Sequence, residues 1–240
     1  YAAMVHNLDE SIGLLLEAYD TMGLAENTYL IFTSDNGGMP TLPIQVNKGE
    51  PYSAGLNSPL LRGKWDLTEG GIRVPFAVMG PGVEAGSQSN EPVISYDLLP
   101  TVADIAGATD ALPDELDGRS IRHVLKNPKS KIQRPTEGLV FHFPHYNVCG
   151  LNEPHSAIRI GDYKLLKFTS SNRELLFNVA DDPSESVDLY EANIALAGKL
   201  NTELETYLDA VDAEKPEESN SWKNGRSGAT KTLFLSRYPK

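Results

Sequence analysis

The N-terminal part of the chain combines a helical pattern with a continuous apolar run. Apolar residues recur at helical spacing between positions 5 and 22 and would form one stripe along a helix. The stripe consists of Val5, Leu8, Ile12, Leu15, Leu16, Tyr19 and Met22. Gly23 follows at a position where a left-handed residue commonly ends a helix. Residues 29–34 are mostly apolar, aromatic or β-branched, which is typical of a strand buried on both faces of a parallel sheet. The pattern therefore predicts a helix-to-strand step of a layered α/β fold.

Shorter patterns of the same two kinds follow. A second strand is expected over residues 74–79. A helix is expected over residues 97–106, where Ser95 or Asp97 could cap its start and Gly107 would end it. Residues 38–62 between these elements show little periodicity, and we interpret them as a functional loop.

Composition shifts near residue 128, and strand-like runs dominate beyond it. The runs cover residues 139–143, 157–160, 163–168 and 174–177, with a hairpin signal at Gly161 and Asp162. A long helix is expected over residues 190–211. Its inner face would hold Ile194, Leu200, Leu204, Tyr207 and Leu208. We therefore predict two domains: residues 1–128 form α/β layers, and residues 129–240 form a small antiparallel sheet with a helix and a polar tail.

Composition narrows the class of protein more than it identifies a function. The chain has 240 residues, of which 40% are apolar and 22% charged, as in ordinary globular proteins. A net charge of −12 argues against a nucleic-acid partner or an anionic membrane surface, although a local basic pocket stays compatible with it. No apolar run is long enough to span a bilayer. Cys149 is the only cysteine, so no intrachain disulfide can form, and the redox compartment stays open.

Candidate chemistry begins directly after the first predicted strand. Ser-Asp-Asn-Gly-Gly at 34–38 places a carboxylate and an amide oxygen side by side. In open α/β sheets this end of a strand is where ligands bind, and hard oxygens suit a cation such as Ca²⁺. An ordinary Asx turn explains the same residues, and the turn alone leaves both interpretations open.

Later segments, in the same order, favour a ligand site. They read Asn-Ser-Pro-Leu-Leu-Arg-Gly-Lys at 57–64, Glu-Gly-Gly-Ile-Arg-Val-Pro at 69–75, Asp-Leu-Leu-Pro-Thr at 97–101, Asp-Gly-Arg-Ser at 117–120 and Asp-Pro-Ser-Glu at 182–185. Together with the turn at 34–38, they resemble the second signature region and the later motifs of the sulfatases. The resemblance implies an alkaline-phosphatase-like sheet layered with helices, present in part, followed by a small antiparallel-sheet subdomain.

The resemblance also implies roles for individual residues. Asp35 and Asn36 correspond to calcium ligands, and Asp35 would also lie near a formylglycine hydrate and help to deprotonate it. Lys64 corresponds to the lysine that contacts the sulfate and the leaving oxygen. Arg62 stands one place nearer to Lys64 than is common in the family, and Trp65 replaces a usual glycine. These departures put the role of Arg62 in question more than that of Lys64.

One part of the sulfatase pattern is missing. The family carries its nucleophile in an early Cys-x-Pro/Ala-x-Arg motif, whose cysteine becomes formylglycine. Cys149 is followed by Gly-Leu-Asn and does not match this motif. Asp35 and Asn36 supply only two oxygens, whereas Ca²⁺ takes six to eight, so the resemblance assigns the other carboxylates to an upstream Asp-Asp pair. The chain therefore resembles the C-terminal portion of a sulfatase, and we expect it to be inactive by itself.

Two histidines form the other candidate cluster. His142 and His145 lie three residues apart in an aromatic run, and His155 is the nearest further candidate for a zinc ligand. A structural histidine explains the run equally well. Because a similar run lies at the pocket rim in sulfatases, His142 is a candidate substrate contact. We also expect Glu69 and Arg73 to form a buried pair that fixes the backbone near Lys64.

Two other functions remain open at this stage. A phosphoester or phosphonate hydrolase of the same superfamily would share the core, but Lys64 and the segment at 69–75 favour a sulfatase. A non-catalytic binding module derived from a sulfatase would keep the same motifs without turnover. The implied substrate is a sulfated small molecule or a sulfated carbohydrate, and the family is periplasmic, secreted or lysosomal.

Overall fold

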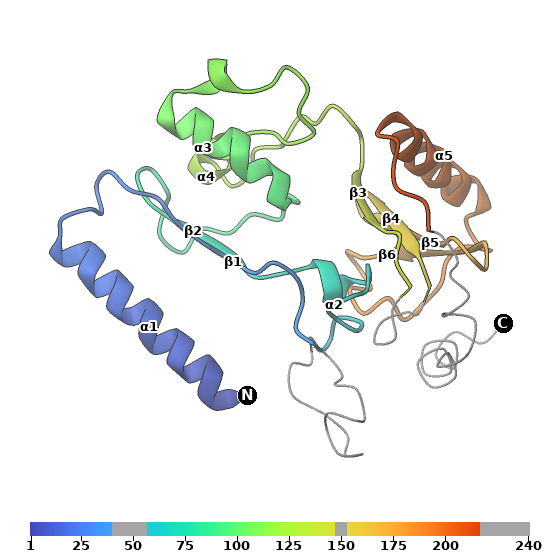
Figure 1. Ribbon diagram of the computed structural model, residues 1–240, viewed down its shortest axis with the longest axis horizontal. Helices are drawn as coiled ribbons and strands as arrows, with labels where there is room; N and C mark the ends of the chain where they lie inside the picture. The colour runs from blue at the N-terminus through green and yellow to red at the C-terminus, as the bar shows by residue number, and fades with distance from the viewer. Residues whose placement is uncertain (40–56, 147–152, 217–240) are drawn as a thin grey trace. The chain divides into compact units, whose positions relative to one another are not determined.

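The computed structural model describes residues 1–39, 57–146 and 153–216 (Figure 1). Cys149, residues 40–56 of the expected functional loop and most of the polar tail lie outside the described residues. The chain divides into two compact units, of which the first holds Tyr1–Thr33 with Pro75–Glu137 and the second holds Ser34–Val74 with Gly138–Lys240. The domain boundary expected at residue 128 stays a prediction.

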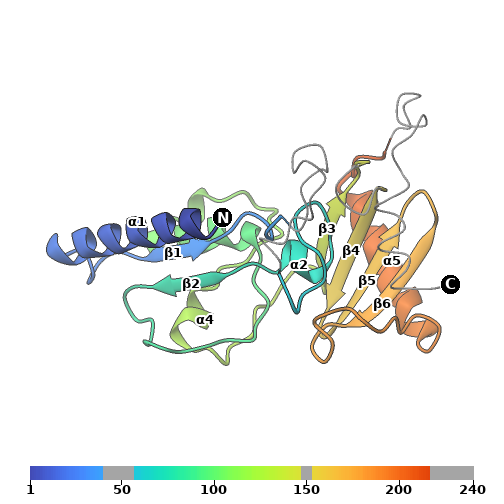
Figure 2. The ribbon, with the colours of Figure 1, turned by 90° about the horizontal axis from the view of Figure 1, so that it is seen from below.

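The first unit contains the predicted N-terminal helix, the first two predicted strands and the helix expected after them. Its elements are α1 (Ala2–Thr21), β1 (Leu30–Thr33), β2 (Phe76–Met79), the 3₁₀ turn η1 (Ser95–Asp97), α3 (Leu98–Ala106), the 3₁₀ turn η2 (Thr109–Ala111) and α4 (Arg122–Lys126). Gly23 and Gly107 follow α1 and α3 with φ of 67° and 68°, the left-handed conformation predicted for both helix ends. Figure 2 shows β1 and β2 side by side.

The predicted burial of the first strand on both faces is wrong for this chain. β1 pairs with β2 in antiparallel register, with Leu30 opposite Met79, and the Phe32 side chain is 46% exposed. The apolar stripe of α1 is also largely exposed, and Tyr19 is the one buried residue of that helix. The periodicity of apolar residues identifies the face of an element that would be buried. Whether other elements cover that face depends on the tertiary structure. None of the described residues provides that layer.

Asp97 is the N-cap residue of α3, one of the two caps predicted, but its carboxylate makes no capping hydrogen bond to that helix. Its carboxylate accepts two hydrogen bonds from the Arg134 guanidinium, both 2.6 Å, and one from the Ile94 N–H at 3.0 Å. It also accepts the Arg119 N–H at 3.0 Å, and it is buried. A bidentate pair with further backbone donors is how a buried carboxylate is stabilised. The Asp-Leu-Leu-Pro-Thr segment is therefore a structural element of this unit.

The second unit is built on an antiparallel sheet with strand order β3-β4-β5-β6. The strands are β3 (Leu139–Phe143), β4 (His155–Ile160), β5 (Tyr163–Phe168) and β6 (Arg173–Asn178), and the helix α5 (Ile194–Ala210) follows. Gly161 has φ of 58° in the turn between β4 and β5, as the hairpin signal predicted. The short helix α2 (Glu69–Ile72) also belongs to this unit.

Each face of this sheet carries a separate apolar core, because alternate strand residues point to opposite faces. One face holds Ile158, Leu165 and Leu176, which pack against α5. The other holds Ala157, Leu166, Leu175 and Phe177. This second face packs against Leu61 and Leu67, which lie on either side of Lys64 in the sequence. Of the predicted inner face of α5, Leu200 and Leu204 are buried, whereas Ile194 in the first turn is 60% exposed.

Candidate functional site

The turn after β1 holds the first two candidate residues. Asp35 is exposed and its Oδ1 accepts the Asn36 N–H at 3.0 Å, while the Ser34 hydroxyl donates to the Asn36 carbonyl at 2.9 Å. Asn36 is half-buried. The residues therefore form a locally hydrogen-bonded turn, but the Gly37 N–H, which an Asx turn at Asp35 would bond, donates to the Gly71 carbonyl instead. That turn leaves the Asp35 carboxylate open to solvent, so it does not exclude a ligand role.

The two glycines of this turn are packed directly against the backbone of a distant segment. The Gly37 N–H donates to the Gly71 carbonyl at 2.9 Å, and the Lys64 N–H donates to the Gly38 carbonyl at 3.1 Å. A Cβ on Gly37 would lie 1.7 Å from the Gly70 oxygen, and one on Gly71 would lie 1.9 Å from the Asp66 oxygen. The glycines are thus required for close approach, which brings the turn at 34–38 beside the loop that carries Lys64.

Asn57 joins the same two segments with its side chain. Its Oδ1 accepts the Gly38 N–H at 3.1 Å, and its Nδ2 donates to the carbonyls of Gly38 at 3.1 Å and Arg62 at 2.8 Å. One amide therefore fixes both the end of the turn and the start of the loop around Lys64.

The loop around Lys64 has an unusual backbone. Arg62 and Trp65 have φ of 59° and 77°, a left-handed conformation that costs a non-glycine residue of the order of 1–3 kcal/mol and is concentrated at functional sites. The Arg62 guanidinium pairs with the buried Asp66 carboxylate. The unusual spacing of Arg62 therefore places it in a structural ion pair within the loop. The Thr68 hydroxyl donates to the Leu61 carbonyl at 2.8 Å and closes the loop.

Lys64 itself is half-buried, and its Nζ lies 5.8 Å from the centre of the Trp65 ring. A cation at this distance from an aromatic face is weakly attracted to it. In the described part of the chain, no carboxylate is paired with its ammonium group. The loop thus presents a cation that is held by its backbone.

The predicted buried pair of Glu69 and Arg73 is not what fixes this loop. Arg73 is mostly exposed, and its Nη1 lies 3.8 Å from Glu69 Oε2. The buried partner of Glu69 is Lys164 of β5, whose Nζ lies 3.0 Å from Glu69 Oε1 and 2.6 Å from Glu185 Oε1. Glu185 Oε2 accepts the Glu69 N–H at 2.7 Å. Burial raises the pKa of the Glu185 carboxyl, although the Lys164 ammonium acts in the opposite direction.

Sequence reasoning missed Lys164, although a signal was present. A lysine within the apolar strand 163–168 is unusual, and strand alternation places it on the same face as Leu166. Glu185 ends the Asp-Pro-Ser-Glu motif, and that motif by itself assigns it no role. A long-range ion pair leaves no periodic pattern, so sequence alone does not join the two positions.

His155 is the second side chain of the sheet that reaches this loop. Its Nε2 accepts the Leu67 N–H at 3.1 Å, and its Nδ1 donates to the Glu153 carbonyl at 2.7 Å. These contacts require the neutral ring. Burial lowers the pKa of the imidazole to about 4 and so keeps that form at neutral pH. His155 is therefore a structural residue, and the described residues contain no group of three or more metal-binding side chains around it.

Two overlapping family models match this chain. The family model described as N-sulphoglucosamine sulphohydrolase, C-terminal, matches residues 63–214, and the sulfatase family model matches residues 1–108. The chain belongs to the sulfatase family.

Several named relatives agree with this assignment. A sulfatase from Formosa agariphila is 35% identical and covers 87% of this chain, and an ulvan-active sulfatase from the same organism is 32% identical and covers 89%. This sulfatase chain spans 39% and 37% of their lengths, about two fifths. A crystal structure of Ps i-CgsB in complex with k-i-k-neocarrahexaose is 29% identical, with a TM-score of 0.69 over 100% of this chain and 48% of that one. The predicted fold class, a partial alkaline-phosphatase-like α/β fold, is confirmed.

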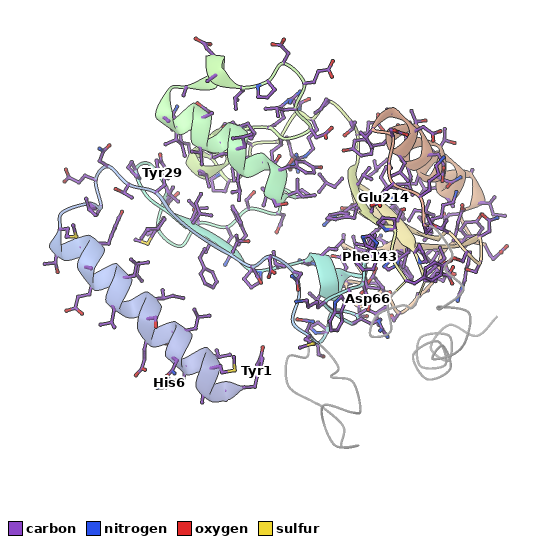
Figure 3. The ribbon with its side chains drawn as sticks, in the orientation of Figure 1. Tyr1, His6, Tyr29, Asp66, Phe143 and Glu214 are labelled. Carbon is purple, nitrogen blue, oxygen red and sulfur yellow. The ribbon has the colours of Figure 1, made fainter. Side chains whose placement is uncertain are left out.

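The sulfatase chain places His142 away from the Lys64 loop. His142 lies in register with Ser156, on the sheet face that packs against α5, whereas Leu61 and Leu67 pack against the opposite face. Its Nδ1 lies 2.8 Å from the Ser156 hydroxyl and its Nε2 lies 2.7 Å from the Glu214 carbonyl. Figure 3 labels Glu214, which follows α5, and Phe143, the neighbour of His142. A substrate contact by His142 would require one of these hydrogen bonds to open, and it stays a prediction.

A hollow of about 580 Å³ lies beside His145 in the same unit. Its lining consists of Pro144, His145, Tyr146, Glu214, Lys215 and Pro216. His145 is exposed, and it packs edge-to-face against Phe143 with 5.3 Å between ring centres. These residues do not include Asp35, Asn36 or Lys64. The predicted catalytic residues therefore lie elsewhere in the unit.

Asp35 and Asn36 fit calcium by donor type but not by number. A carboxylate and an amide oxygen are hard ligands, yet Ca²⁺ takes six to eight oxygens. No group of three metal-binding side chains occurs in the described residues, so these two positions offer part of a site. Among the described helices, none has the length and apolar character needed to cross a bilayer.

Proposed function

We propose that this chain is the C-terminal portion of a sulfuric ester hydrolase, in which Lys64 binds the sulfate and the leaving oxygen. The observation that carries the proposal is the hydrogen bond from the Lys64 N–H to the Gly38 carbonyl, reinforced by Asn57. It holds the lysine of one signature segment beside the Asp-Asn turn of another. Membership of the sulfatase family supports the reaction class. The contact between the two segments supports the choice of Asp35, Asn36 and Lys64 as site residues.

The charges at the proposed site suit sulfuryl transfer. A sulfuryl group carries negative charge on its outer oxygens, and charge builds up on the leaving oxygen in the transition state. A lysine ammonium is a compact charge that can approach such an oxygen. The backbone of the Lys64 loop is hydrogen-bonded to Gly38, to the Asn57 side chain and, at Leu67, to His155. Lys64 would therefore be oriented before substrate arrives.

Asp35 and Asn36 would hold part of a calcium site in the same protein. When bound, the ion would supply positive charge against the sulfate oxygens. The exposed Asp35 carboxylate would also take a proton from the family's formylglycine nucleophile, which belongs to a motif that this sequence lacks. The remaining calcium ligands would come from the upstream Asp-Asp pair that the family resemblance implies. The isolated chain would therefore be unable to turn over a sulfate ester.

The proposed substrate class is a sulfated carbohydrate. Of the similar proteins, one is named an ulvan-active sulfatase and another was crystallised with k-i-k-neocarrahexaose. A small sulfate ester would fit the same cation. The chain as a whole is acidic, with a net charge of −12, so the positive charge at Lys64 is local.

Kinetics of the longer protein that contains this chain test the proposal. Lys64→Ala should lower kcat/KM for a sulfate ester by about 100-fold or more, the loss typical of removing one group that stabilises transition-state charge. Lys129→Ala, at an exposed lysine of the first unit, should leave kcat/KM unchanged. Turnover by the isolated 240-residue chain, or a fully active Lys64→Ala enzyme, would refute the proposal.

A further inference from the structure

Leu67 is held by the sheet in three ways at once. Its side chain lies in the core on the sheet face that also carries Leu166 and Leu175. Its N–H donates to His155 Nε2 at 3.1 Å, and its carbonyl accepts from Lys164 Nζ at 3.0 Å. His155 comes from β4 and Lys164 from the neighbouring strand β5, and both are buried. Two polar side chains in the core thus bond the backbone of one loop residue.

Burying these two side chains needs a physical reason. An ammonium group is taken out of water at a large cost unless it is paired and fully hydrogen-bonded. Lys164 donates hydrogen bonds to the Leu67 carbonyl and the Glu69 carboxylate, and its ammonium forms an ion pair with Glu185. Every one of these contacts except Glu185 belongs to the loop and helix that follow Lys64. Glu185 in turn binds the Glu69 N–H, so the whole cluster is directed at this segment.

The contacts fix Lys64 from its C-terminal side. Gly38 and Asn57 hold the loop at Lys64 and Arg62, and Leu67 is the next backbone position bonded from outside the loop. Between them lie the left-handed Trp65 and the Asp66 that pairs with Arg62. A strained backbone persists only where its surroundings determine it from both ends. Releasing Leu67 would therefore let the Lys64 loop relax.

We infer that Lys164 and His155 are positioning residues for Lys64, through which the C-terminal sheet sets the place of the sulfate-binding amine. The inference rests on the proposed function of Lys64. Neither residue touches the substrate in this scheme, and both act through Leu67 and Glu69. Displacing a catalytic group by about 1 Å can cost about 100-fold in rate. We therefore expect substitutions at Lys164 and His155 to lower kcat/KM strongly, although both residues act on the Lys64 amine only through Leu67 and Glu69.

A double-mutant cycle in the longer protein separates positioning from general stability. His155→Gln keeps an acceptor for the Leu67 N–H and should retain most of the activity, whereas His155→Leu should lower kcat/KM by about 10- to 100-fold. In a Lys64→Ala background the same His155→Leu change should alter kcat/KM by less than about threefold, because residues that act as a unit are not additive. An equal loss in both backgrounds would overturn the inference and leave the role of Lys64 intact. Full activity of Lys64→Ala would instead remove the proposed function and the inference together.

Lys164 needs a variant that avoids stranded charges. Lys164→Met alone leaves the carboxylates of Glu69 and Glu185 buried without a cation, so its failure to fold would not by itself test positioning. The triple variant Glu69→Gln, Lys164→Met, Glu185→Gln removes all three charges and should fold. Its kcat/KM should be lower than that of wild type, and this loss should largely disappear in the Lys64→Ala background. Activity equal to wild type in this variant would overturn the role of Lys164. Lys129→Met is the matched control at an exposed lysine.

Hydrogen exchange of the 240-residue chain gives a readout that does not depend on turnover. His155→Leu should speed amide exchange in the segment 61–72 by about tenfold or more, while His155→Gln should resemble wild type. Exchange in β6 and α5 should change far less, because these elements are held by their own ladders and core. Unchanged exchange at 61–72 in His155→Leu would contradict the inference.

Discussion

The backbone N–H of Lys64 donates to the carbonyl of Gly38 across 3.1 Å, joining two motifs that are 26 positions apart. Through this bond the Asp-Asn turn and the lysine loop form a single unit of structure. The close approach depends on glycines at 37, 70 and 71, where a Cβ would meet a carbonyl oxygen at 1.7, 2.3 and 1.9 Å. The glycines of both motifs are therefore explained by packing.

Replacing one of these glycines should separate the two motifs. Gly37→Ala would force its Cβ against the Gly70 carbonyl, and we expect it to lower the free energy of unfolding by about 2 kcal/mol or more. Gly198→Ala is the matched control, because this helical glycine of α5 has no atom within 4 Å of the added Cβ. It should raise stability by about 0.5–1 kcal/mol. Urea unfolding of both variants checks the difference, and equal stabilities would contradict the packing argument.

The Asn57 side chain should matter for stability because it makes three hydrogen bonds to backbone groups. Asn57→Ala would leave the Gly38 and Arg62 groups without these partners, and we expect a loss of about 1–3 kcal/mol. Asn57→Asp keeps one acceptor but turns a carboxylate oxygen toward the Gly38 and Arg62 carbonyls, so it should be no more stable than Asn57→Ala. The midpoints of urea denaturation measure the order. If Asn57→Ala were as stable as wild type, the hydrogen bonds of the Asn57 side chain would not be needed for stability.

Stability should fall as the pH is lowered from about 6.5 to about 4 because of His155. Its folded pKa of about 4 lies below the unfolded value near 6.5, so the unfolded state binds more protons in this window. The stabilisation is complete above about 6.5 and is lost on acidification, by an amount of the order of 3 kcal/mol. The raised pKa of Glu185 acts in the opposite sense. The difference between wild type and His155→Gln isolates the histidine, and parallel pH profiles would contradict this prediction.

The apolar stripe of α1 should make the isolated chain self-associate. Leu8 and Leu15 of this stripe are both more than half exposed, and exposed apolar patches of this kind favour association. Leu8→Lys together with Leu15→Lys should reduce association in sedimentation experiments while changing unfolding free energy by less than about 0.5 kcal/mol per site. Leu204→Lys, in the core beside the sheet, should unfold the second unit instead. Association that survives the double variant would rule out this face as its cause.

Calcium binding by the isolated chain should be weak. Asp35 and Asn36 provide two oxygens, and even extracellular modules with complete ligand sets bind Ca²⁺ with Kd of about 0.1–1 mM. Titration calorimetry of the 240-residue chain should therefore show Kd above about 1 mM. In the longer protein, Asp35→Ala should weaken calcium binding, with Asp9→Ala on exposed α1 as the control. Micromolar binding by the isolated chain would mean that a complete site lies within it.

Local pattern was enough to predict most elements. The helix ends at Gly23 and Gly107, the hairpin at Gly161 and the four strands after residue 138 follow from short-range physics, since each depends on residues a few positions apart. The motif at 34–38 likewise identified a turn with hard oxygens. The motif did not predict that the Asp35 carboxylate is exposed while groups of its turn are hydrogen-bonded to one another.

The sequence by itself therefore determined the family, the order of the elements and the residues Asp35, Asn36 and Lys64 as candidates. Only the tertiary structure decided which residues hold the lysine loop. It replaced the expected Glu69–Arg73 pair with Lys164 and Glu185, it gave His155 to the Leu67 backbone, and it put His142 on the other face of the sheet. The physical reason is that burial and ion pairing between residues about a hundred positions apart depend on how strands and loops meet in space. Periodicity reports only which face of a single element is apolar.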